Sequence, residues 1–96
     1  MTPTLQPAAS ASATLVIDKQ GKAKADPVVS LRGIEDPAGS LAKAVVTGLK
    51  EVLADLSAAE RRNDGQIEQA ARQAVRRVVR AHLGKKPLTD VHIVRI

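Results

Sequence analysis

The chain has 96 residues, the size of one small domain, and a core of this size stabilises a fold only modestly. It contains no cysteine and no aromatic residue, which excludes disulfides, thiolate chemistry, zinc knuckles and base stacking on aromatic rings. The net charge of +5 favours anionic partners, while two histidines and ten scattered carboxylates offer little for catalysis. Composition therefore favours an interaction domain over an enzyme.

The two ends of the chain differ in character. Residues 1–12 are rich in Pro, Ala and Ser, carry no charged side chain, and lack the basic start and apolar stretch of a secretory signal. We therefore expect residues 1–12 to be a flexible leader or a cloning remnant, and the protein to be cytoplasmic, without a membrane partner. Because the chain stops on an apolar run, residues 88–96, we expect it to be the carboxyl end of a longer protein.

Two strands are expected before the first helix. Residues 13–17 are apolar and partly β-branched, and a turn that ends at Gly21 follows them. Residues 28–32 form the return strand, after a proline that cannot donate to a regular ladder. Residues 33–39 contain two glycines and one proline, which predicts a loop.

Two main helices are expected next. An N-cap at Ser40 begins an apolar stripe at three- and four-residue steps, and Gly48 within it indicates close approach of another backbone. A capping box at Ser57 predicts a short extra turn, and the second long helix then runs from about residue 63 to a left-handed cap at Gly84. Its side chains expected to point inward are Ile67, Ala71, Ala74, Val75 and Val78.

The final strand, residues 88–96, completes an α+β fold. The order β-β-α-α-β predicts a two-layer sandwich in which a three-stranded sheet carries two helices on one face. The first and last strands are apolar on both sides, so we expect the other sheet face, or an edge, to meet a second copy or a neighbouring domain. The residues expected to take part in self-association are Leu15, Val16, Ile17, Val94 and Ile96.

Basic side chains gather in the second half of the chain. Residues 57–86 carry eight basic and three acidic side chains, which accounts for the whole net charge. These basic side chains either form a phosphate-contacting ridge for RNA or DNA, or belong to a solvated helix face that keeps a small protein soluble. The sequence favours the second interpretation. Without aromatic residues, such contacts would hold a nucleic-acid backbone and not read its bases. The candidate RNA-binding residues are Arg72, Arg76, Arg77, Arg80, Lys85 and Lys86.

The two histidines predict no catalytic centre. His82 is expected near the inward side of the second helix, as a packed or helix-capping residue. His92 and Asp90 should share one face of the last strand, a geometry that allows a hydrogen-bonded pair. No nucleophile motif, phosphate-binding loop or metal-ligand motif occurs. We therefore predict no catalytic residue and no metal site, and a hydrolase would need a nucleophile or metal from a partner.

Several short motifs follow one another in a recognisable order. They are the strand and turn at 15–21, the Asp-Pro to Arg-Gly segment at 26–33, the basic stretch at 75–80, the Gly-Lys-Lys-Pro at 84–87 and the strand at 91–96. In this order they resemble the C-terminal domain of ribonuclease J, a bacterial ribonuclease of the metallo-β-lactamase/β-CASP group. Asp26 and Ile34 depart from the glycine and the aromatic residue that the family often has there.

The resemblance covers residues 13–96 and implies a non-catalytic accessory domain. It implies a parent enzyme that degrades RNA from the 5′ end, also cuts it internally, and holds zinc in a catalytic region whose motifs this chain lacks. The expected partners are a second copy, the catalytic region of the parent chain, and RNA. The alternative hypothesis is a sequence-nonspecific RNA-binding module that uses the basic helix face.

Overall fold

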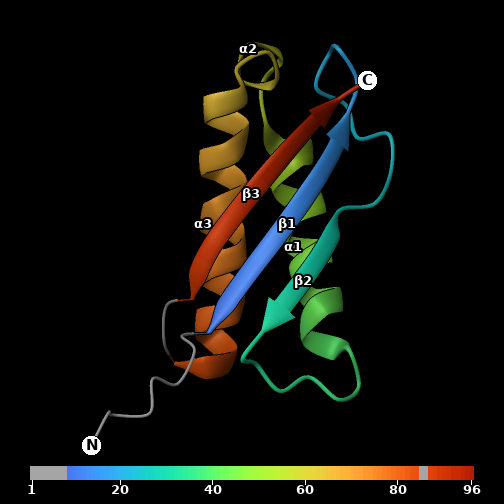
Figure 1. Ribbon diagram of the computed structural model, residues 1–96. Coiled ribbons are helices and arrows are strands. Elements are labelled where there is room, and N and C mark those ends of the chain that lie inside the picture. The colour runs from blue at the N-terminus through green and yellow to red at the C-terminus, as the bar shows by residue number, and fades with distance from the viewer. Residues whose placement is uncertain (1–8, 85–86) are drawn as a thin grey trace, which may run out of the picture.

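The computed structural model of the protein describes residues 9–84 and 87–96 (Figure 1). Its elements are β1 (Ser10–Ile17), β2 (Val28–Arg32), α1 (Ser40–Asp55), the single turn α2 (Ala58–Arg61), α3 (Asp64–Leu83) and β3 (Leu88–Arg95). The α+β fold and the order of its elements are confirmed, with α1 and α3 behind one face of the sheet. Over these residues, no helix combines the length and apolar character needed to cross a membrane.

The sheet has β1 in its centre, with β2 and β3 on either side. β2 pairs antiparallel to β1, whereas β3 pairs parallel to it over its whole length. β1 and β3 are parallel neighbours and therefore require a crossover connection. The chain makes this connection through β2 and then α1, α2 and α3. Both edges of the sheet therefore belong to strands that follow β1 in the chain.

Strand β1 begins at Ser10, three residues before the predicted start. The predicted leader is therefore too long, because residues 10–12 are part of the central strand, and residues 1–8 lie outside the described part of the chain. Alternate side chains of β1 are buried against the helices. This face of β1 consists of Ala11, Ala13, Leu15 and Ile17.

The start of α1 differs from the prediction. Ser40 is the first helical residue, and the N-cap position is Gly39, whose φ of 70° is left-handed and which has no side chain to cap with. The carboxylate of Asp36 instead accepts hydrogen bonds from the backbone N–H groups of Leu41 and Ala42, both at 3.0 Å. These bonds, with Leu41 the larger contributor, hold the pKa of Asp36 below its usual value.

The core lies between the sheet and the two long helices. Val79 is fully buried in α3, whereas Val78, predicted to point inward, is half-buried and packs against Gly48 of α1. A Cβ at Gly48 would lie 3.3 Å from Cγ2 of Val78, so the close neighbour is a side chain rather than a backbone. His82 is exposed, and its predicted inward position is wrong.

Candidate functional site

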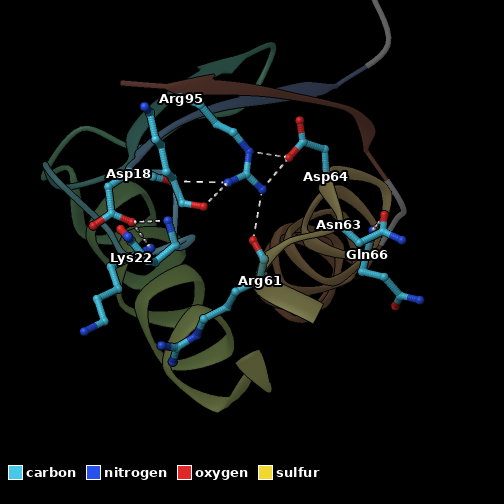
Figure 2. Close-up of polar contacts among 9 residues, drawn as sticks. Asp18, Lys22, Arg61, Asn63, Asp64, Gln66 and Arg95 are labelled. Carbon is cyan, nitrogen blue, oxygen red and sulfur yellow. Dashed lines mark hydrogen bonds and ion pairs between the residues drawn. The ribbon is translucent and has the colours of Figure 1, made fainter. Parts of the chain in front are cut away.

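At one end of the molecule, the side chain of Arg95, at the end of β3, forms hydrogen bonds with several other segments of the chain (Figure 2). Its Nε donates to Oδ1 of Asp64, the first residue of α3, at 2.6 Å. Its two terminal nitrogens donate to the backbone oxygens of Arg61 at 2.9 Å and of Asp18 and Lys19 at 3.2 Å. Arg95 therefore ties together β3, the turn after β1, the end of α2 and the start of α3.

A second arginine reinforces the same end. The guanidinium of Arg61 donates to the backbone oxygens of Leu53 and Ala54, at 3.3 and 3.0 Å, near the end of α1. Gly21, with a φ of 81°, packs directly on Arg61, and a Cβ there would lie 2.4 Å from the Arg61 oxygen. These contacts engage both arginines and the glycine in holding the fold together.

The carboxylates with lowered pKa values also serve the fold. Asp18 accepts hydrogen bonds at 2.9 Å from the backbone N–H groups of Lys22 and Gln20, which lower its pKa and shape the turn after β1. Glu60 accepts a bond from the backbone N–H of Ser57 in the predicted capping box, and that bond lowers its pKa. These hydrogen bonds stabilise the charged form of each carboxylate, whereas a general acid must hold its proton and needs a raised pKa.

Within the described part of the chain, no element covers the sheet face opposite the helices (Figure 1). We call it the open face. Cross-strand register arranges its side chains in rows: Arg32, Ser10 and Leu88; then Ser30, Ser12 and Asp90; then Val28, Thr14 and His92; and finally Val16 and Val94, with Ile96 beyond them. Four large apolar side chains on this face are well exposed, at 63% for Val28, 66% for Leu88, 44% for Val94 and 64% for Ile96.

The polar end of the open face is hollowed. A cavity of about 240 Å³ is lined by Ser10, Ala11, Ser12, Ser30, Arg32, Asp90 and His92. Asp90 and His92 share this face, as their spacing predicted. Across residues 9–84 and 87–96, neither Arg32 nor Asp90 has a salt-bridge or hydrogen-bond partner for its side chain. A positive and a negative group thus stand on opposite edges of this face, each without a partner among the described residues.

The residues predicted for self-association divide between the two sides of the sheet. Val16, Val94 and Ile96 lie on the open face, where a partner can reach them. Leu15 and Ile17 are each 1% exposed and pack in the core beneath the helices. Their place in the predicted contact set is wrong, because alternate residues of one strand point to opposite faces.

The candidate RNA-binding arginines lie on α3. Arg76, Arg77 and Arg80 are exposed, whereas Arg72 is half-buried and forms an ion pair at 2.5 Å with Glu68, one turn earlier. Arg72 and Arg76 also line a groove of about 420 Å³ on this helix, together with Gly65, Glu68, Gln69 and Gln73. Lys85 and Lys86 lie outside the described residues. We call Arg76, Arg77 and Arg80 the basic ridge.

The described residues do not form a site suited to zinc. Nowhere in residues 9–84 and 87–96 do three side chains from His, Cys, Asp and Glu gather closely enough to hold a metal ion. Zinc sites in proteins use three or four such ligands, so the donor set of these residues does not fit the metal.

A comparison with protein families identifies one match. The model of the family described as the ribonuclease J C-terminal domain matches residues 11–96. The matched range includes both long helices, β2, β3 and all of β1 except Ser10. No curated protein matches the chain in a sequence search.

Proposed function

The chain belongs to the ribonuclease J C-terminal domain family, and on that premise we propose that it is a non-catalytic accessory domain that brings copies of its parent enzyme together. The parent is a zinc-dependent ribonuclease that shortens RNA from the 5′ end and also cuts it internally, in cytoplasmic RNA processing and decay. Its zinc and its catalytic residues belong to a separate catalytic region. The accessory domain contributes the surface through which copies of the enzyme associate.

The open face is the observation that carries this proposal. A small domain rarely leaves several large apolar side chains exposed on one uncovered layer, because their hydration costs free energy that burial would recover. Here Val28, Leu88, Val94 and Ile96 are all exposed on one face, and α1 and α3 both lie behind the other. Contact with a second copy would cover part of this face.

Sedimentation of the 96-residue chain over a concentration series tests the proposal. We expect a reversible increase in mass at high concentration, and we expect Val94→Lys to weaken it by placing a charge on the open face. Ala44→Lys is the matched control, because Ala44 is exposed on α1 and not on the sheet. A monomeric mass at every concentration would contradict self-association by this domain.

A second function is supported by the basic ridge. Three exposed arginines within two turns of α3 form a strip of positive charge that suits a phosphate backbone. We propose that, as an alternative role, this strip binds single-stranded RNA without sequence preference. The affinity should fall steeply between about 50 and 200 mM salt, because neutralised phosphates release their counterions.

Fluorescence anisotropy with an end-labelled RNA tests this second function. The variant with Arg76→Glu, Arg77→Glu and Arg80→Glu should lose binding. The control carries the same total charge change at exposed lysines of the turn after β1: Lys19→Glu, Lys22→Glu and Lys24→Glu. Equal loss in both variants would show only a response to net charge, and unchanged binding in the first would exclude the ridge.

A further inference from the structure

We propose that two copies of this chain stack open face on open face about a two-fold axis parallel to β1, with Arg32 of each copy paired to Asp90 of the other. This inference rests on the proposed self-association and names its geometry. It starts from two exposed charges that the described part of the chain leaves without partners, one on each edge strand.

The register of the sheet places these charges on opposite edges. Arg32 of β2 pairs with Ser10, and Asp90 of β3 pairs with Ser12, the next residue of β1 on the open face. The two backbones are therefore separated by two strand spacings, roughly 10 Å, and by one side-chain step of roughly 7 Å along the strands. Positive charge on one edge and negative charge on the other make the face complementary to a rotated copy of itself.

A two-fold axis along β1 exchanges the edges of the sheet. It lays β2 of one copy over β3 of the other and keeps every row at its own height. Asp90 of one copy then faces Ser30 of the other, since both are level with Ser12. Arg32 is the next open-face residue of β2, about 7 Å along, a distance that its long side chain spans. An axis across the strands would instead lay β3 on β3, leaving Arg32 far from Asp90.

The same stacking covers two of the four exposed apolar side chains, Val28 and Leu88, whereas Val94 and Ile96 lie beyond the end of β2 of the other copy. The central strand presents only the small side chains of Ser10, Ser12, Thr14 and Val16, so two copies of β1 can approach closely. Val28 of one copy then faces His92 of the other. The aliphatic part of the Arg32 side chain lies over Leu88, which is the most exposed large apolar residue of this face. No charged side chain is left in the middle of the interface.

The area of the face sets the strength of the contact. β1 and β3 have eight residues each and β2 has five, so strands about 4.8 Å apart with about 3.3 Å per residue give a footprint of roughly 330 Å² per copy. Both copies together bury roughly 660 Å², which is less than the ~1,200 Å² at the lower end of stable interfaces. The isolated domain should therefore dimerise weakly. Tethering to a larger enzyme that has further contacts would strengthen it through effective concentration.

Charge reversal tests the pairing directly. Arg32→Glu and Asp90→Arg each place like charges at both contacts of the dimer, so each should weaken self-association at least tenfold in sedimentation equilibrium. The double variant should dimerise again to within about threefold of the original chain. An equimolar mixture of the two single variants should also associate, because opposite charges then meet at both contacts. The matched controls are Arg77→Glu and Asp55→Arg, which reverse exposed charges on the helices.

Cross-linking tests the axis independently. The chain has no cysteine, so a single Ser12→Cys places one thiol on β1 beside the axis. A short bismaleimide should join two copies of this variant readily. A Thr47→Cys control, exposed on α1, should give little product at the same concentration.

The outcomes separate this inference from the function on which it rests. A chain that dimerises but is insensitive to both single reversals would overturn the Arg32–Asp90 pairing and leave self-association standing. Weakening by both single reversals without recovery in the double variant or the mixture would also overturn it. A chain that stays monomeric at millimolar concentration would overturn both proposals and assign the open face to another domain.

Discussion

The side chain of Arg95 makes the sharpest prediction for stability. Arg95→Ala removes a guanidinium that donates hydrogen bonds to three separate segments of the chain. The acceptor residues lie 31 to 77 positions from Arg95 in the sequence. Its acceptors are the carboxylate of Asp64 and the backbone oxygens of Asp18, Lys19 and Arg61. Truncation would leave the ends of four elements without the group that joins them.

The magnitude follows from the exposure of these contacts. The Arg95 side chain is 26% exposed and that of Asp64 is 60% exposed, so solvent screens the ion pair, which should contribute about 1 kcal/mol or less. Hydrogen bonds from a charged donor are worth about 1.5–3 kcal/mol when well made, and the three carbonyl contacts are partly wet and share one side chain. We expect a loss of about 2–4 kcal/mol in the free energy of unfolding, or roughly 10–25 °C in Tm for a domain of this size.

Far-UV circular dichroism in urea measures this loss, since the chain has no aromatic residue to report by fluorescence. Arg95→Lys should recover only a minor part of it, because an ammonium group cannot reproduce the planar fork of donors. Arg77→Ala, at an exposed position of α3, should change the free energy of unfolding by less than about 0.5 kcal/mol. Unfolding of Arg95→Ala and Arg77→Ala at the same urea concentration would contradict this role of Arg95.

Three further predictions concern the core and the turns. Gly21→Ala should lower the free energy of unfolding by more than about 2 kcal/mol, since its Cβ would overlap the Arg61 oxygen. Gly39 also has a positive φ but open space around it, so Gly39→Ala should lower the free energy of unfolding clearly less in the same urea titration. Leu49→Ala, at a fully buried position, should cost about 2–5 kcal/mol, and a loss below 1 kcal/mol would contradict its place in the core. The backbone hydrogen bonds that lower the pKa of Asp36 stabilise the folded protein above the unfolded-state pKa of about 3.9. This stabilisation is lost as the pH falls through the lower pKa of the folded state. Asp36→Asn should therefore destabilise the protein at pH 7 and not near pH 2. A gap between Asp36→Asn and the original chain that persists at pH 2 would contradict this assignment.

Features that depend on a few neighbouring residues could be predicted from the sequence. The capping box at Ser57, the cap near residue 63 and the left-handed end at Gly84 all appear where the local pattern placed them. In each case the residues that form the feature lie within a few positions of one another. The element order followed from the same local signals, because each helix and strand has its own periodicity and its own breakers.

Features that depend on contacts between distant segments could not be predicted in this way. Arg95 looks like one more basic residue in a strand, and nothing near it in the sequence marks its four acceptors. The same holds for Gly21, whose lack of a side chain is required by Arg61, forty residues later. The start of α1 failed for a related reason, because Asp36 reaches past Gly39 and caps a helix that begins several residues away.

The assignment of the open face depends on where β1 begins. Leu15, Val16 and Ile17 form a continuous apolar run, and three apolar residues in a row do not show which of them points inward. The alternation becomes clear only when the strand is extended back to Ser10, since Ser10, Ser12 and Thr14 then alternate with Ala11 and Ala13. This phase sends Leu15 and Ile17 into the core and Val16 to the open face. The small polar residues that settle the orientation are also those that would let two central strands approach, so the start of β1 bears on both the fold and the proposed interface.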